Sequence, residues 1–382
     1  MQPSFYDFSP VFRMLVTGLL VASGPLLWVY LRNRRTHALG MLHALTLVTL
    51  FLTFDLVMFG AFTRLTDSGL GCPDWPGCYG NASPLGASSE IDAAQKAMPT
   101  GPVTPGKAWV EMVHRYLAMG VGVLITVLAG SAWLGSRARE PGGGWHKTLP
   151  LLTFVWVCVQ GAFGALTVTM KLFPAIVSLH LLGGYVLLAL LTVQAHLIGP
   201  RVPMHEVFPS GLRTLVALAL ALLVVQAMSG AWVSTNYAVL ACTEFPHCQG
   251  SWWPTMDFAK GFEIWRPLGF DAAGAHISFQ ALTAIHFTHR LLAMFTLAVL
   301  AWLAWRLGRH DTTQRPARWL GGLASLQLLT GLSNVVLDWP LVAAVIHTGG
   351  AGAMMVVLVR VLCVTYAHNE QARSSVLERS LA

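Results

Sequence analysis

Charged residues are scarce in this sequence. Aspartate, glutamate, lysine and arginine make up 11% of its 382 residues, whereas hydrophobic residues make up 55%. A soluble domain carries about 25% charged residues, so this composition excludes an ordinary soluble enzyme. The net charge of +7 does not indicate nucleic-acid binding, because the basic residues are distributed over several connections between apolar runs.

Long apolar runs take the place of charge. A helix needs roughly 20 apolar residues to cross the hydrocarbon, and only helices and closed barrels satisfy their backbone groups in lipid. Runs of this length predict helices. We expect nine membrane-spanning helices, at about 12–31, 42–62, 109–134, 148–169, 174–198, 213–234, 276–305, 318–337 and 340–366.

Lysine and arginine are divided unequally between the two ends of these runs. The connections after the odd-numbered runs hold 15 of the 24, and the opposite side holds seven. The positive-inside bias places the larger set in the cytoplasm. We therefore expect a bacterial-type inner (cell) membrane protein with its N-terminus outside and its C-terminus in the cytoplasm. The first run lacks a basic start and a cleavage site, so we interpret it as a retained helix.

Two cysteine-containing segments show that the sequence repeats itself. "RLTDSGLGCPDWPGCYG" (residues 64–80) and "NYAVLACTEFPHCQGSWWP" (residues 236–254) each hold two cysteines with five residues between them. "EMVHR" (residues 111–115) follows the first segment and "HFTHR" (residues 286–290) follows the second. Further on, "FPAIVSLHLLGG" is matched by "WPLVAAVIHTGG".

The offsets within this repeat are 170 residues for the cysteines, 175 for the His-Arg pairs and 167 for the later histidines. They indicate a duplicated four-helix unit, and such repeats bear directly on the fold. We predict an all-α integral membrane protein with two tandem, repeat-related four-helix bundles. The expected divisions are an extra N-terminal helix and loop in 1–40, the first bundle in 41–200, and the second bundle with a cytoplasmic tail in 201–382.

Four histidines recur in pairs within the helices: His114 and His180 in the first half, His289 and His347 in the second. Two histidines from facing helices can ligate a heme iron from both sides. Zinc is the rival metal, but it prefers about four ligands. We expect the glycine pairs 183–184 and 349–350 to leave room for a flat macrocycle, and we interpret three Gln-x-x-x-Gly patterns (residues 160–164, 226–230 and 327–331) as helix packing.

The two halves differ beside the first histidine of each pair. Glu111 lies three residues before His114 and on the same helical face, whereas the matching position in the second half is His286. A carboxylate there would stabilise a developing cation or act as a base on water; the alternative is an interfacial carboxylate at a helix N-terminus. Arg115 and Arg290 would pair with heme propionates or anchor the helices at the membrane surface.

The six cysteines fall into two groups. Cys158 and Cys363 stand alone in helices and are interpreted as small buried apolar residues. The other four lie in segments expected outside, where disulfides persist. Each pair would be a local staple over a heme pocket, or a redox-active disulfide.

These motifs together resemble the heme A synthase family. The resemblance rests on "TRLTDSGLGCPDWPGCYG", "EMVHR", "LACTEFPHCQGSWWP", "THR" at residues 288–290, and the later histidines, and it covers about residues 42–366. The family has an eight-helix core, so the extra first helix departs from it.

The resemblance implies an oxidoreductase that oxidises the C8 methyl group of heme O to a formyl group by successive hydroxylations, with water as the oxygen source. It implies that His114 and His180, with Arg115, hold the substrate heme, and that His289 and His347, with Arg290, hold a permanent heme b. It also implies that Glu111 is catalytic and that the cysteine pairs are loop disulfides, Cys72 with Cys78 and Cys242 with Cys248.

The expected partners are heme O, membrane lipid, an unidentified electron acceptor and a heme O synthase, with no nucleic acid. Three alternatives use the same sequence features. A di-heme electron-transfer cytochrome would need the histidines but not Glu111. A membrane thiol oxidoreductase would use the outer cysteines but leaves the histidines unexplained. A transporter would place its polar residues near the midplane, whereas here they gather toward the outer side.

Overall fold

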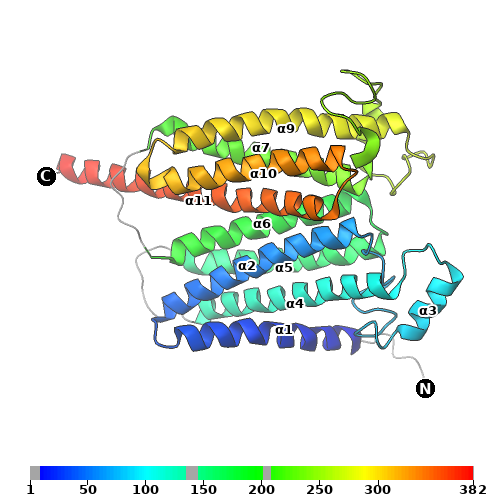
Figure 1. Cartoon of the computed structure of the whole chain (residues 1–382). Helices are drawn as coiled ribbons and strands as arrows, with labels where there is room; N and C mark the ends of the chain where they lie inside the picture. Colours follow the sequence, from blue (N-terminus) through cyan, green and yellow to red (C-terminus); the bar gives the residue numbers. More distant parts are fainter. Residues whose placement is uncertain (1–8, 135–144, 201–207, 382) are drawn as a thin grey trace. The chain divides into compact units, whose positions relative to one another are not determined.

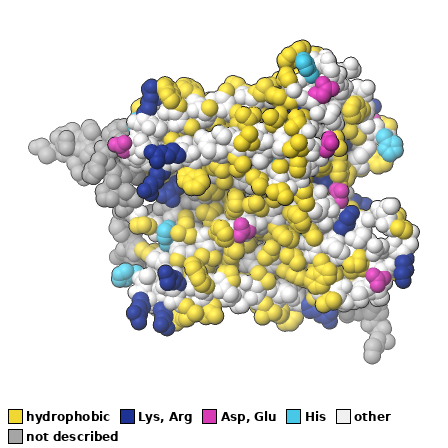
Figure 2. Space-filling view, viewed as in Figure 1, with side chains coloured by type: hydrophobic (Ala, Val, Ile, Leu, Met, Phe, Trp, Pro, Cys, Tyr) yellow, Lys and Arg dark blue, Asp and Glu magenta, His cyan; other side chains and the backbone are white. Residues whose placement is uncertain are grey.

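The computed structural model describes residues 9–134, 145–200 and 208–381, and these residues are helical without strands. Nine of the described helices are long and apolar enough to cross a membrane. Figure 2 shows mostly hydrophobic side chains along the visible helix surfaces, with lysine and arginine toward the helix ends. The prediction of an all-α integral membrane protein is confirmed. Two basic connections, residues 135–144 and 201–207, lie outside the described residues, and the orientation stays a prediction.

The chain divides into two compact units, Met1–Gln194 and Ala195–Ala382. The first unit holds the N-terminal helices shown in blue to green in Figure 1. Their bounds are α1 Ser9–Asn33, α2 Ala38–Leu65, α3 Ser88–Ala97, α4 Pro105–Leu134, α5 Trp145–Thr169 and α6 Pro174–Ile198.

Helix α4 lies at the centre of the contacts in the first unit. It packs against α1, α2, α3 and α5, and a hydrophobic core containing Leu45, Leu124 and Leu191 joins α2, α4 and α6. Polar contacts fix α6 on both sides. Trp156 of α5 donates a 2.9 Å hydrogen bond to the carbonyl of Gly183, and Gln194 donates to the hydroxyl of Thr46 in α2.

In the second unit, four long helices pack in a closed ring. Helix α7 packs against α9, α9 against α10, α10 against α11, and α11 against α7. Two short helices lie between α7 and α9. The bounds are α7 Ser210–Thr235, η1 Ala238–Ala241, α8 Phe258–Gly261, α9 Phe279–Leu307, η2 Asp311–Thr313, α10 Gln314–Val336 and α11 Leu341–Leu381.

The backbone repeats with the offsets found in the sequence. Non-glycine residues with positive φ are uncommon, yet they occur in matched pairs at 170 or 167 residues. The pairs are Asp67 with Tyr237, Tyr79 with Gln249, Lys171 with Asp338, and Leu172 with Trp339, with φ between 48° and 63°. The connections after matching helices therefore fold alike in both units.

Helix α1, which stands outside the repeat, is an integral part of the first unit. A Cβ on Gly18 would lie 2.9 Å from Cβ of Met119, and one on Gly120 would lie 2.7 Å from Val21, so α1 and α4 approach closely through glycine. Met14 joins the buried cluster that contains Cys72 and Cys78. The helix therefore supports both α4 and the cysteine-containing segment above it.

We expect Gly120→Leu to push α1 from α4 and to lower the free energy of unfolding by about 1–3 kcal/mol, the usual range for overpacking. The matched control is Gly122→Leu on the same helix, where an added side chain meets nothing within 4 Å. Denaturation of the purified protein by SDS in mixed micelles measures both. Equal unfolding midpoints for the two variants would contradict this account of α1.

Candidate functional site

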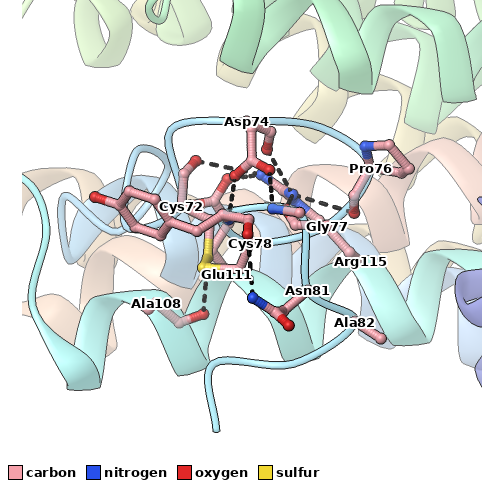
Figure 3. Close-up of a disulfide and its surroundings, with 12 residues drawn as sticks. Cys72, Asp74, Pro76, Gly77, Cys78, Asn81, Ala82, Ala108, Glu111 and Arg115 are labelled. Carbon is pink, nitrogen blue, oxygen red and sulfur yellow. Dashed lines mark hydrogen bonds and ion pairs between the residues drawn. A yellow bond between two sulfur atoms is a disulfide. The ribbon is translucent and has the colours of Figure 1, made fainter. Parts of the chain in front are cut away.

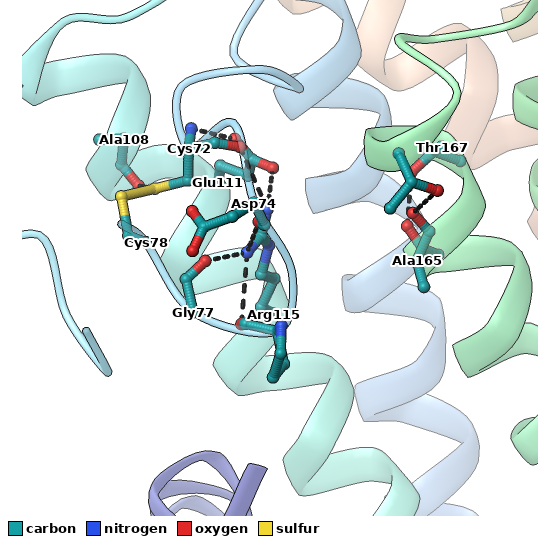
Figure 4. Close-up of polar contacts among 12 residues, drawn as sticks. Cys72, Asp74, Gly77, Cys78, Ala108, Glu111, Arg115, Ala165 and Thr167 are labelled. Carbon is teal, nitrogen blue, oxygen red and sulfur yellow. Dashed lines mark hydrogen bonds and ion pairs between the residues drawn. A yellow bond between two sulfur atoms is a disulfide. The ribbon is translucent and has the colours of Figure 1, made fainter. Parts of the chain in front are cut away.

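Arg115 of α4 fastens the first cysteine loop, residues 66–87, to the helix. Its Nη1 donates to the backbone carbonyls of Asp74, at 2.9 Å, and of Gly77, and its Nη2 donates to Glu111 of the same helix. The guanidinium group is buried, with 8% of the residue exposed. Figures 3 and 4 show these groups gathered beneath the loop. Charge-assisted hydrogen bonds of this kind are the strong ones, so Arg115 acts as a clamp on the loop.

Glu111 is the second contact between α4 and the first cysteine loop. Its Oε2 accepts a 2.8 Å hydrogen bond from the backbone N–H of Cys72, while its Oε1 is paired with Arg115. Only 3% of the residue is exposed. Glu111 is therefore a buried carboxylate held by two donors, and its catalytic role stays a prediction.

The loop holds its own shape through Asp74, a residue that the sequence analysis missed. Its two carboxylate oxygens accept from the backbone N–H groups of Tyr79, at 2.6 Å, and of Gly80, at 2.7 Å, where φ is positive at both residues. Burial, with the charges of Asp74 and Glu90, raises the pKa of the Tyr79 phenol. The signal in the sequence is an aspartate five residues before a Tyr-Gly turn.

The second cysteine loop, residues 236–257, is clamped in the same way. Arg290 of α9 donates through Nη1 to the carbonyl of Glu244 and through Nη2 to that of Cys242, both at 2.7 Å. In place of a carboxylate, Arg290 meets Nε2 of His286 at 3.2 Å. We expected both arginines to pair with heme propionates or to anchor the helices at the membrane surface. In the structure both guanidinium groups bind loop carbonyls.

The structure joins Cys72 to Cys78 and Cys242 to Cys248 as disulfides. All four residues are fully buried, which favours a staple over an exchanging disulfide because exchange requires access to the sulfur. Cys158, which we expected to be buried, is exposed on α5. In a membrane span such a position faces lipid at no cost to an apolar side chain.

Each of the four paired histidines lies against a glycine on a neighbouring helix. A Cβ on each glycine would lie 3.0–3.5 Å from Cε1 of the imidazole. The pairs are Gly60 with His114, Gly164 with His180, Gly230 with His289, and Gly331 with His347.

Three of these glycines belong to the Gln-x-x-x-Gly patterns, so the patterns do more than pack helices. Glutamine side chains contact the glycine pairs that follow the later histidines. Gly183 is contacted by the amide of Gln160, and Gly350 by the amide of Gln327. These glutamines occupy the space beside Gly183 and Gly350, and room for a macrocycle at the glycine pairs stays a prediction.

The buried imidazoles fit a heme iron better than zinc. Within the described residues no group of three or more His, Cys, Asp or Glu is placed to hold a metal ion, whereas zinc prefers about four such ligands. A heme needs only two axial histidines from facing helices. Nδ1 of His114 and Nδ1 of His180 are buried with no hydrogen-bond partner among the described residues, so these rings are not committed to a structural hydrogen bond.

The fold and the paired sites define a multi-pass membrane protein with two similarly built units, each with a buried histidine pair below a disulfide loop. The family model for cytochrome oxidase assembly proteins matches residues 43–359. The chain belongs to this family, that of the heme A synthases.

Relatives named heme A synthase match most of the chain. The protein of Shewanella oneidensis is 38% identical over 82% of this chain and 93% of its own length. That of Symbiobacterium thermophilum is 30% identical over 81% of this chain and 90% of its own. That of Halalkalibacterium halodurans is 27% identical over 76% and 86%.

The clamp can be tested on each loop separately. Arg115→Ala removes several buried hydrogen bonds to a charged group, each contributing about 1.5–3 kcal/mol. We therefore expect the Cys72–Cys78 disulfide to be reduced at least about tenfold faster by a water-soluble phosphine. Alkylation of the freed cysteines, followed by peptide mass analysis, measures the rate.

Arg290→Ala is the reciprocal control. It should speed the reduction of the Cys242–Cys248 disulfide by the phosphine and leave the reduction rate of Cys72–Cys78 unchanged. If either variant loosened both loops equally, general destabilisation rather than a local clamp would be the cause.

Proposed function

We propose that this protein is a heme A synthase of a bacterial-type inner membrane, with its cysteine loops on the outer side and its C-terminus in the cytoplasm. It oxidises the C8 methyl group of heme O to a formyl group by successive hydroxylations, with oxygen from water and electrons passed to an acceptor. The observation that carries the proposal is the match, along 93% of its length, to a relative named heme A synthase. Heme O synthase is the expected supplier of substrate.

The asymmetry at Glu111 supports the assignment of the two sites. The first unit has the buried carboxylate three residues from His114, whereas the second unit has His286 at the matching position. A site that removes protons and electrons from a methyl group needs an anionic group, and a site that only relays electrons does not. We therefore assign the substrate heme to His114 and His180, and a resident heme b to His289 and His347.

The residues of the first unit have different roles. His114 and His180 bind and orient the substrate, and a bound heme b supplies a second redox centre for the electrons. Glu111 receives protons or stabilises positive charge, and Arg115 and the Cys72 N–H hold its two carboxylate oxygens in place. Arg115 contacts both Glu111 and the loop carbonyls. It positions Glu111 and keeps the first cysteine loop closed, which excludes bulk water.

The direct test is to express the chain in cells that make heme O but no heme A, and to extract and mass-analyse the hemes. We expect a formyl-bearing heme A. Bound heme b with heme O unchanged would instead favour an electron-transfer cytochrome.

In the same cells we expect Glu111→Gln to lower heme A formation by at least about 100-fold, since general acid–base groups contribute 10²–10⁴. Bound heme b should be unchanged. Glu90→Gln, at an exposed carboxylate of α3, is the matched control and should retain activity. Normal heme A formation by Glu111→Gln would remove this residue from the mechanism.

A further inference from the structure

The residue just before each histidine-facing glycine differs between the two units. In the second unit it is a hydroxyl residue, Ser229 of α7 and Thr330 of α10. In the first unit it is an aromatic residue, Phe59 of α2 and Phe163 of α5. The glycines correspond, so these four positions are equivalent within the repeat. The difference therefore concerns the immediate neighbours of the four imidazoles.

Thr330 gives the clearest case. Its Oγ1 donates its only hydrogen to the carbonyl of Leu326, at 2.7 Å on the same helix, and lies 2.8 Å from Nδ1 of His347. With its hydrogen so directed, the oxygen accepts from the imidazole when His347 carries its proton on Nδ1. Nε2 is left with its lone pair, which is the form that ligates a metal.

Ser229 lies in the corresponding position beside His289. Its Oγ donates to the carbonyl of Gln226, at 2.8 Å, and lies 2.8 Å from Nδ1 of His289. The side-chain amide of Gln226 also comes within 3.1 Å of this nitrogen. The amide nitrogen of Gln226 can only donate, so the neighbours of His289 do not fix one tautomer. Thr330 is the side chain that contacts Nδ1 of His347, and it is the better position for a test.

The first unit has no counterpart to these bonds. Phe59 stacks against the ring of His114, with centroids 6.2 Å apart and planes 10° apart. Among the described residues no hydrogen bond reaches Nδ1 of His114 or of His180. Packing alone thus sets the orientation of these two rings.

We propose that Ser229 and Thr330 are positioning residues that retain heme b, and that their absence from the first unit makes the substrate heme exchangeable. This inference rests on the proposed function. A metal-ligating histidine normally donates its other N–H to a fixed acceptor, which sets the tautomer and ring orientation and raises the basicity of the ligand. Such a bond strengthens the binding of a resident cofactor. A substrate that must leave after oxidation is released more readily by ligands that lack it.

The test uses the full chain carrying His114→Ala, so that bound heme reports on the second unit alone. Thr330→Val keeps the shape of the side chain and removes the hydroxyl. We expect heme b to transfer to excess apomyoglobin 10–100-fold faster, the usual loss for such partners. We also expect a more positive reduction potential, because a less electron-rich imidazole stabilises ferric iron less.

Thr330→Ser should restore both values, because it returns the hydroxyl. The control is Thr365→Val on α11, whose buried hydroxyl donates to Leu362 of its own helix; it should change neither value. Unchanged transfer rate and potential in Thr330→Val would overturn the positioning role, and heme A formation by the otherwise native chain would show that the synthase proposal survives. A parent protein that retains no heme b would overturn both.

Discussion

A polar side chain buried in a membrane-spanning helix must find its partner inside the protein, because lipid offers none. This constraint organises both units. Arg115 and Arg290 each bind the carbonyls of a loop that would otherwise be held to its helix by packing alone. The hydroxyl of Thr330 returns its hydrogen to the backbone and then accepts from an imidazole. The outer loops and the two histidines of the second unit are thus placed by the same requirement for internal partners.

Duplication supplied two copies of this arrangement, and a few substitutions separate their roles. Both copies keep the arginine clamp, the disulfide and the glycine under each imidazole. They differ where Glu111 is replaced by His286, and where Phe59 and Phe163 are replaced by hydroxyl residues. The shared features place a histidine pair and a disulfide loop in each unit. The differing ones decide whether that site carries a carboxylate and whether its ligands are fixed.

The spanning helices, the repeat and the cysteine pairs were predictable because each depends on local patterns: apolar length, spacing and recurring motifs. The contacts of Arg115 were not, because a long guanidinium side chain reaches whatever carbonyls the loop presents after it folds. The glycine under His114 was missed because Gly60 lies in a different helix and lacks the preceding glutamine of its three counterparts. The glutamines beside Gly183 and Gly350 show that a glycine in a helix predicts a close contact. The sequence does not predict which side chain makes that contact.

Helix α1 shows how a segment outside the repeat bears on one site only. It contacts α4 through Gly18 and Gly120, below the turn that carries Glu111, and Met14 reaches the cluster around the first disulfide. Those contacts all belong to the first unit, the one assigned to the substrate. If the rings of His114 and His180 lack fixed hydrogen bonds, the geometry of that site depends more heavily on the packing of α4. An additional helix against α4 therefore stabilises the site whose own ligands are held least firmly.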